Sequence, residues 1–229
     1  MEALLHAAAD FVVADLDLVT EPAALAAARR SLDDSGLLLL GEVPGVRENP
    51  LLIRALIGTF PAAGTLADHR LLWSGDGRIT AGHLAVLAER AAAGALEVIL
   101  SDGTIGAGWS WSQRDEAMAG RILAAAAAGT RTPAVAGNAH TPVSQTDPGV
   151  PLGACLAQRR PGAREIRINY GGGYYCNLQP RRFRCAIPRQ RQIRLYQQDG
   201  ALVLDLPSAE EAVVPQRSQS RLPPAREEP

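Results

Sequence analysis

Short apolar runs separated by helical segments are the feature that most restricts how this chain can fold. The runs at 37–40 and 96–100 are almost continuously apolar, and strands are also expected at 132–136 and 165–170. A strand that is apolar along its whole length is typical of a parallel sheet covered on both faces. Because helical segments lie between these strands, the sequence predicts an α/β fold of three layers, with a mostly parallel central sheet flanked by helices.

The C-terminal part of the chain changes from this pattern to extended segments. Asp199-Gly200 stands between two apolar stretches and predicts a tight turn, so we expect an antiparallel β-hairpin extension at about 190–207. Residues 208–229 are rich in Pro, Arg, Glu, Ser and Gln, and we expect a disordered tail there. With 229 residues, 47% of them hydrophobic, the chain is predicted to form a single domain over 1–207.

Charge and composition exclude several classes of function. The formal net charge is −1, so the chain as a whole has no attraction to nucleic acid or to an anionic membrane. All 23 basic residues are arginine, which excludes a Schiff-base lysine and a phosphate-loop lysine. The three cysteines include no CxxC pair, so no thiolate metal site is expected. No secretory signal or membrane-spanning stretch is recognisable, and we expect a cytoplasmic protein with no membrane partner.

Polar loops follow the predicted strands, and two of them carry groups suited to catalysis. In open α/β sheets, ligands bind outside the carboxyl ends of the strands. Glu42 and Glu48 lie in the first such loop and His140 in another. The carboxylates could act with His140 on a water molecule or bind a hard cation. Alternatively, Glu48 is a charge beside a helix N-terminus, and His140 is a loop histidine bound by backbone groups.

A third loop leads into a helix and carries aromatic and charged residues. Ser112 and Asp115 have the spacing of a capping box, which favours a helix cap or a partner of the helix dipole over a catalytic role for Asp115. The guanidinium of Arg114 could orient an anionic group of a ligand. Trp109 and Trp111 are two residues apart and could line a flat ligand pocket or pack the loop onto the core.

Three motifs in these loops resemble a known superfamily, which joins the Tiki proteases, the TraB-like proteins, ChaN and erythromycin esterase. The segment 41–48, Gly-Glu-Val-Pro-Gly-Val-Arg-Glu, is similar to the first motif of esterase-like and ChaN-like members, Gly-Glu-x-His-Gly followed by Glu. Arg-Asp-Glu-Ala-Met-Ala at 114–119 and Gly-Asn-Ala-His at 137–140 are similar to two further segments. The resemblance spans roughly 36–180.

The resemblance implies hydrolysis by an activated water molecule. His140 would be the base, Glu42 or Glu48 its carboxylate partner, and Arg114 the residue that orients the substrate. Pro44 stands where the family has its first histidine, and proline has neither an acid–base group nor a backbone N–H. A weakened or inactive hydrolase is therefore expected. The family also has a strand ending in glutamate after the helix near residue 60, and here that strand is expected to be replaced by a loop.

Two other functions remain open. ChaN-type relatives bind haem, so the resemblance also implies a small-ligand binding module with haem or a divalent metal, and His140 or Tyr170 as the axial ligand. The third alternative is polyanion binding, because seven arginines and no acidic residue lie between Glu165 and Asp199. These arginines, which could equally form a solvated sheet face, are residues 167, 181, 182, 184, 189, 191 and 194.

Overall fold

The computed structural model describes residues 17–43, 46, 48–60, 64–68, 96–101, 108–126, 131–177, 179–183 and 192–207, with backbone alone at 64–68, 96–100, 125 and 174–183. The predicted tail at 208–229 and Pro44 lie outside these residues.

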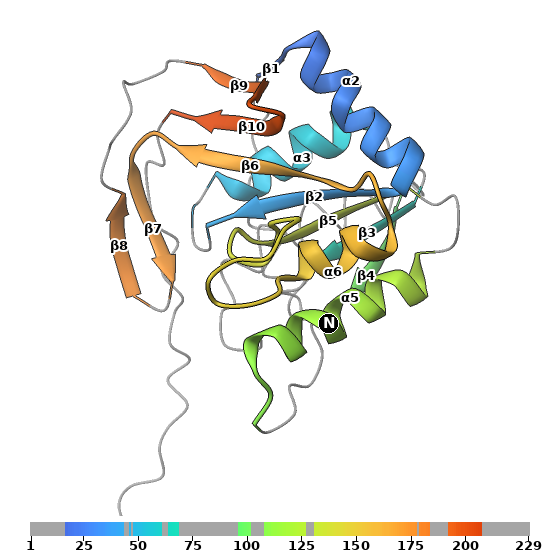
Figure 1. The fold of residues 1–229 in the computed structure, drawn as a ribbon. Coiled ribbons are helices and arrows are strands. Elements are labelled where there is room, and N and C mark those ends of the chain that lie inside the picture. Colours follow the sequence, from blue (N-terminus) through green and yellow to red (C-terminus); the bar gives the residue numbers. More distant parts are fainter. Residues whose placement is uncertain are drawn as a thin grey trace, which may run out of the picture.

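The described strands form one large sheet and one small hairpin (Figure 1). The large sheet is eight-stranded, in the order β1-β9-β10-β6-β2-β5-β3-β4. Its strands are β1 (Leu18–Thr20), β2 (Leu37–Glu42), β3 (Gly64–Asp68), β4 (Leu96–Leu100), β5 (Thr132–Gly137), β6 (Arg164–Tyr170), β9 (Ile193–Gln198) and β10 (Ala201–Leu206). All neighbours are parallel except β9 and β10. The small hairpin pairs β7 (Gly173–Asn177) with β8 (Gln179–Phe183).

Helices cover both faces of the sheet, which confirms the predicted three-layer α/β fold (Figure 1). One face packs against α2 (Pro22–Arg30), the π-helical turn Ser31–Ser35 and α3 (Asn49–Thr59). The other packs against α5 (Trp111–Ala125) and α6 (Leu152–Arg159). No helix in the described part of the chain is long and apolar enough to cross a membrane.

The central strand β2 explains why its sequence is apolar without alternation. Leu38 and Leu40 pack in the core with α2 and α3, whereas Leu37 and Leu39 pack in the core with α5 and α6. All six residues of β2 are buried. A strand with a helix layer on each face has no solvent side, so polar residues at every second position would be buried without partners.

The C-terminal hairpin is present, and it continues the main sheet. Asp199 and Gly200 both have positive φ, 49° and 80°, as a two-residue turn with the twist of a hairpin requires. Strand β10 then pairs with β6 in parallel, while β9 pairs with the short edge strand β1. The hairpin therefore extends the parallel sheet on the β6 side.

The loop predicted after residue 60 is wrong at 64–68, where β3 forms. Gly-Thr-Leu-Ala-Asp has little local strand signal, but β3 pairs with β4 along its whole length and with β5 at Ala67 and Asp68. Hydrogen bonds to two neighbouring strands outweigh the weak local preference. The strand expected to be missing is thus present, and its last residue, Asp68, is acidic.

The capping box of α5 was also predicted two residues too late, at Ser112 where the N-cap is Ser110. Ser110 is the N-cap and accepts a hydrogen bond from the backbone N–H of Gln113, whose side chain accepts from the N–H of Ser110. Ser112 and Asp115, which were predicted as the box, bind elsewhere. Their partners lie on and before α6, as described below.

Candidate functional site

The carboxyl ends of β2 and β5 form the switch point of the sheet. These neighbouring parallel strands leave it in opposite directions: β2 leads to α3 on one face, and β5 leads to α6 on the other. Ligands of open α/β folds bind in the crevice that such diverging connections create. Glu42 ends β2, and the loop carrying His140 follows β5. The backbone N–H of Asn138 donates to the carbonyl of Glu42 at 2.6 Å, which joins the two loops.

The ring of His140 is held by a buried carboxylate. Nδ1 of His140 lies 2.7 Å from Oδ1 and 2.9 Å from Oδ2 of Asp115, in the second turn of α5. The Asp115 side chain is 0% exposed, and that of His140 is 14% exposed. An ionised carboxylate can only accept hydrogen bonds, so Nδ1 carries the proton and Nε2 is the basic nitrogen.

An aromatic ring fixes the imidazole from one side. Trp111, the first residue of α5, stacks on His140 with ring centroids 5.1 Å apart and an angle of 21° between the planes. Stacking at this distance restricts rotation of the histidine ring. Trp109, two residues earlier, is 43% exposed and is free of this stack.

Asp115 also binds the N-terminus of α6, the next helix described in the chain. Its Oδ2 accepts a hydrogen bond of 2.8 Å from the backbone N–H of Leu152, the first residue of α6, and the carbonyl of His140 accepts one of 2.9 Å from Gly153. Ser112 accepts from the N–H of Val150 just before this helix. Donors at a helix N-terminus lack partners within the helix, and here α5 and the histidine loop supply them. Histidine, aspartate and α6 thus form one hydrogen-bonded unit.

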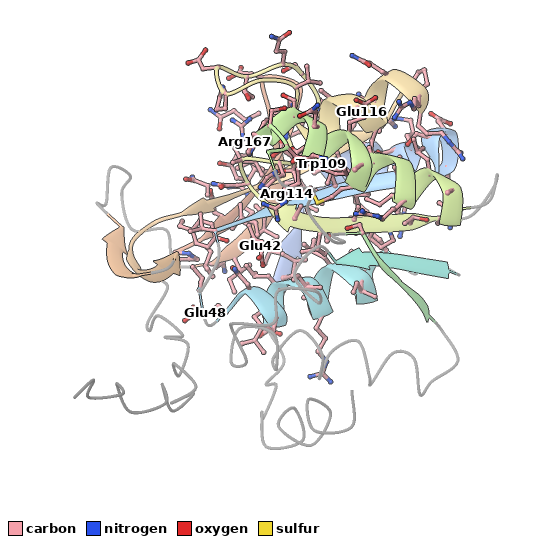
Figure 2. All side chains as sticks on the ribbon, turned by 90° about the horizontal axis from the view of Figure 1, so that it is seen from below. Glu42, Glu48, Trp109, Arg114, Glu116 and Arg167 are labelled. Atoms are coloured by element: carbon pink, nitrogen blue, oxygen red, sulfur yellow. The ribbon has the colours of Figure 1, made fainter. Side chains whose placement is uncertain are left out.

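Glu42 also lies at the carboxyl end of its strand, but on the opposite face of the sheet. Side chains alternate along β2, so Glu42 shares the side of Leu38 and Leu40, which α2 and α3 cover. Figure 2 shows Glu42 between β2 and α3, with Arg114 on the side of α5. The Glu42 side chain is 1% exposed.

Tyr170 joins the loop after β2 to the start of α3. Its hydroxyl accepts a 2.9 Å hydrogen bond from the N–H of Val43 and donates one of 2.8 Å to the side-chain oxygen of Asn49. The amide nitrogen of Asn49 in turn donates to the carbonyl of Val43 at 2.7 Å. A role for Tyr170 as a haem ligand would require its phenol to leave these partners. Glu48 is the residue immediately before α3 and makes no side-chain cap (Figure 2).

A further carboxylate, which is only 9% exposed, lies beside the histidine loop. Thr141, directly after His140 and 0% exposed, donates a 2.6 Å hydrogen bond from its hydroxyl to Oε1 of Glu165 on β6. Burial raises the pKa of Glu165, while the Thr141 hydrogen bond and the charge of Arg167 lower it by less. Arg167 is 63% exposed and lies 3.8 Å from Oε2 of Glu165.

The arginines proposed to bind a polyanion are described only in part. Arg194 forms an ion pair with Glu21 and lies over the ring of Tyr196, and Arg167 lies near Glu165 as noted. Both are on the sheet. The side chains of residues 181, 182, 184, 189 and 191 lie outside the described part, so polyanion binding stays a prediction.

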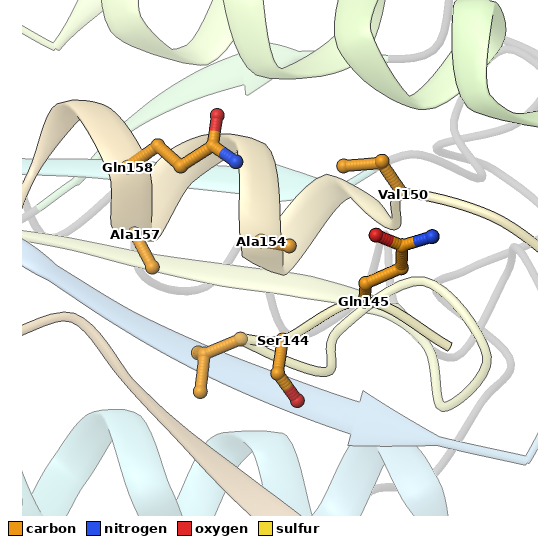
Figure 3. A pocket seen from close by; sticks show the side chains of 7 residues that line it. Ser144, Gln145, Val150, Ala154, Ala157 and Gln158 are labelled. Atoms are coloured by element: carbon orange, nitrogen blue, oxygen red, sulfur yellow. The ribbon is translucent and has the colours of Figure 1, made fainter.

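A shallow pocket lies next to the histidine loop, on α6 (Figure 3). It has a volume of about 290 Å³ and is lined by Val143, Ser144, Gln145, Val150, Ala154, Ala157 and Gln158. None of these residues carries a charge. None of the predicted site residues lines this pocket.

The sequence predicted His140 as a site residue at the carboxyl ends of the strands. It did not predict which side chains bind His140 and its loop. It favoured a helix cap over a catalytic role for Asp115, whereas the structure binds Asp115 to His140 as well as to α6. It assigned no role to Thr141 or Glu165. Glu165 and Arg167 alternate with Ile166, which indicates that one side of β6 is polar. This pattern could have identified Glu165 as a candidate.

Within the described residues, no group of three or more His, Cys, Asp or Glu side chains is placed to hold a metal ion. Comparisons with protein-family models, with curated proteins and with solved structures each found no match.

Proposed function

We propose that this chain is an erythromycin esterase-like and ChaN-like protein whose site hydrolyses a small-molecule substrate through an activated water molecule, with activity weakened by Pro44. One observation carries the proposal: a buried aspartate holds Nδ1 of a histidine at the switch point of an α/β sheet.

The chemistry of the pair supports a base. The Asp115 carboxylate fixes the tautomer of His140 and stabilises the imidazolium that forms when Nε2 takes a proton from water. General-base catalysis of this kind contributes about 10²–10⁴-fold. Trp111 prevents the ring from turning away from this orientation.

Other charged groups would act on the substrate. Arg114 precedes Asp115 in the first turn of α5 and would orient an anionic or carbonyl oxygen. Glu42 ends β2 at the same edge, where a carboxylate would orient the attacking water. Glu48 would support this role from the start of α3.

Hydrolysis of a panel of ester, lactone and peptide substrates tests the proposal, with the wild type and Pro44→His compared with and without divalent metal. We expect weak turnover that rises in Pro44→His and falls about 100-fold or more in His140→Ala and Asp115→Asn. Glu116→Gln is the matched control, because Glu116 is an exposed acid on the same helix, paired with Arg159. Turnover equal in His140→Ala and the wild type would remove His140 as the base.

Haem binding is the second candidate, because a histidine that ligates a metal usually donates its other N–H to a carboxylate. Because Nδ1 of His140 contacts Asp115, Nε2 would be the atom that binds the haem iron. A haem titration that gives no Soret shift, or a shift that His140→Ala retains, would exclude His140 as the ligand.

A further inference from the structure

Contacts from α5, from α6 and from the sheet hold the peptide that carries His140, and the contact from the sheet has no part in the proposed chemistry. The ring is bound by Asp115 and Trp111 on α5, and the carbonyl of His140 is bound by Gly153 on α6. From the sheet, Thr141 is bound by Glu165. Glu165 lies on β6, whereas the histidine loop follows β5.

Two glycines show how closely the loop is packed. A side chain at Gly41 on β2 would overlap Oγ1 of Thr141 and lie 3.0 Å from Oε1 of Glu165. A Cβ at Gly153 would overlap the carbonyl of Thr141 and lie 2.5 Å from that of Pro142. Thr141 therefore has strand β2 beneath its side chain and helix α6 against its carbonyl, so it cannot shift without moving one of them.

Glu165 also lies on the same side of the sheet as His140. Ile166 and Ile168 of β6 face the core with α2 and α3, so Glu165 alternates onto the side of α5 and α6. Glu42, the carboxylate expected to act with His140, alternates onto the other side. Of these two carboxylates, Glu165 therefore lies on the face that carries the histidine.

We propose that Glu165 is a positioning residue of the site, which fixes His140 through the hydroxyl of Thr141. The proposal rests on the proposed function of His140, and it deepens that function by adding a residue that touches no substrate. The carboxylate accepts the Thr141 hydroxyl, and this bond sets the backbone position from which the imidazole reaches Asp115 and Trp111.

The hydrogen bond to Thr141 is the shortest described contact of the Glu165 carboxylate, whose side chain is 9% exposed. Its Oε1 binds Thr141, and its Oε2 lies beyond hydrogen-bond distance of Arg167 at 3.8 Å. The charge is thus held by the threonine hydroxyl more than by the arginine. A misplacement of a catalytic group by about 1 Å can lower the rate about 100-fold, so fixing the loop has a direct effect on catalysis.

The experiment compares variants that keep or remove this one hydrogen bond. Thr141→Val removes the donor at nearly constant shape, and Thr141→Ser restores it. Glu165→Met removes the acceptor, whereas Glu165→Gln retains an acceptor oxygen. The readout is the ¹⁵N and ¹H imidazole spectrum of His140, assigned with His140→Gln, because it reports the tautomer whether or not any substrate is turned over. Glu116→Gln is again the control.

We expect one tautomer, with the proton on Nδ1, in the wild type, Thr141→Ser and Glu165→Gln. Mixed or exchange-broadened signals are expected in Thr141→Val and Glu165→Met. Where turnover is measurable, kcat falls by at least about tenfold in these two variants while KM changes little.

A folded Thr141→Val or Glu165→Met variant with the wild-type imidazole spectrum would overturn the proposal. If both fail to fold, Glu165→Gln still tests it, since an altered tautomer there would show that the charge, and not the hydrogen bond, controls His140. A shifted tautomer in a protein that hydrolyses nothing would support the positioning role and count against the hydrolase.

Discussion

At the carboxyl ends of the strands, the polar groups on the two faces of the sheet have different roles. On the side of α3, the polar groups of Tyr170, Asn49 and Val43 bind one another and close the loop after β2 onto the helix. On the side of α5 and α6, Asp115 binds the ring of a histidine whose side chain is still 14% exposed. The first arrangement fastens a loop to a helix, and the second leaves part of an imidazole ring in contact with solvent.

This difference shows that motif position alone does not decide the role of a residue. Glu42 and Glu165 are carboxylates with little exposure on neighbouring strands, but β-strand alternation turns them to opposite faces. Only Glu165 is bound to the loop of His140. The following predictions test whether the two faces are as separate as the contacts indicate.

Gly153→Ala is expected to have the largest effect. The added methyl group would overlap the backbone carbonyls of Thr141 and Pro142, which cannot rotate away, so the unfolding free energy should fall by about 1–3 kcal/mol or more. The control is Gly120→Ala on α5, where nothing lies within 4 Å, and where alanine should stabilise the helix by about 0.5–1 kcal/mol. Urea unfolding of both variants makes the measurement, and equal effects would contradict the close packing of α6 on the loop.

Tyr170→Phe should destabilise the α3 face without changing the other. The variant leaves the N–H of Val43 and the side chain of Asn49 without the hydroxyl, which costs about 1–3 kcal/mol. We expect this loss in urea unfolding together with an unchanged imidazole spectrum of His140. A changed His140 spectrum would show that the two faces are coupled.

Glu165→Gln should have the smallest effect, and one that depends on pH. Burial raises the pKa of Glu165 in the folded protein, so its protonated form contributes stability below the ordinary carboxyl pKa, and this is lost as the pH rises through the raised pKa. Glutamine cannot ionise, so the variant should gain Tm over the wild type as pH rises through this range. About 1 kcal/mol corresponds to about 2–4 °C in a domain of this size.

Melting curves of wild type and Glu165→Gln across the acidic to neutral range measure this difference. The exposed Glu116→Gln variant should show no such trend, because its carboxylate is 64% exposed. A Tm difference for Glu165→Gln that is flat with pH would mean that the carboxyl group titrates alike in the folded and unfolded chain.

The sequence predicted the elements that have a local signature. Strands β2 and β5 were found from their apolar runs, and the hairpin from Asp199-Gly200, because each pattern lies within a few residues. Strand β3 was missed because its stability comes from pairing with β4 and β5, whose paired residues lie 32 and 67 positions further along the chain (66 to 98 and 67 to 134).

The candidate site was likewise predictable only where a residue has a local signature in the sequence. His140 was found because it follows a buried strand, but its partner Asp115 lies on another helix, and only packing of α5 on α6 brings them together. Ser112 and Asp115 fit the capping pattern as well as Ser110 and Gln113 do in sequence. In the structure, the N–H groups of Val150 and Leu152 bind the side chains of Ser112 and Asp115. The capping box is therefore formed by the other pair.

The sheet order also has a consequence for synthesis of the chain. Strand β1 pairs with β9, so Leu18 meets its partner Ile193 only after 175 further residues have been translated (193 − 18 = 175). Until β10 leaves the ribosome, the edge of β6 has no neighbour on that side and presents open backbone groups to other chains. Nascent chains truncated before β10 should therefore depend on chaperones far more than the completed protein does.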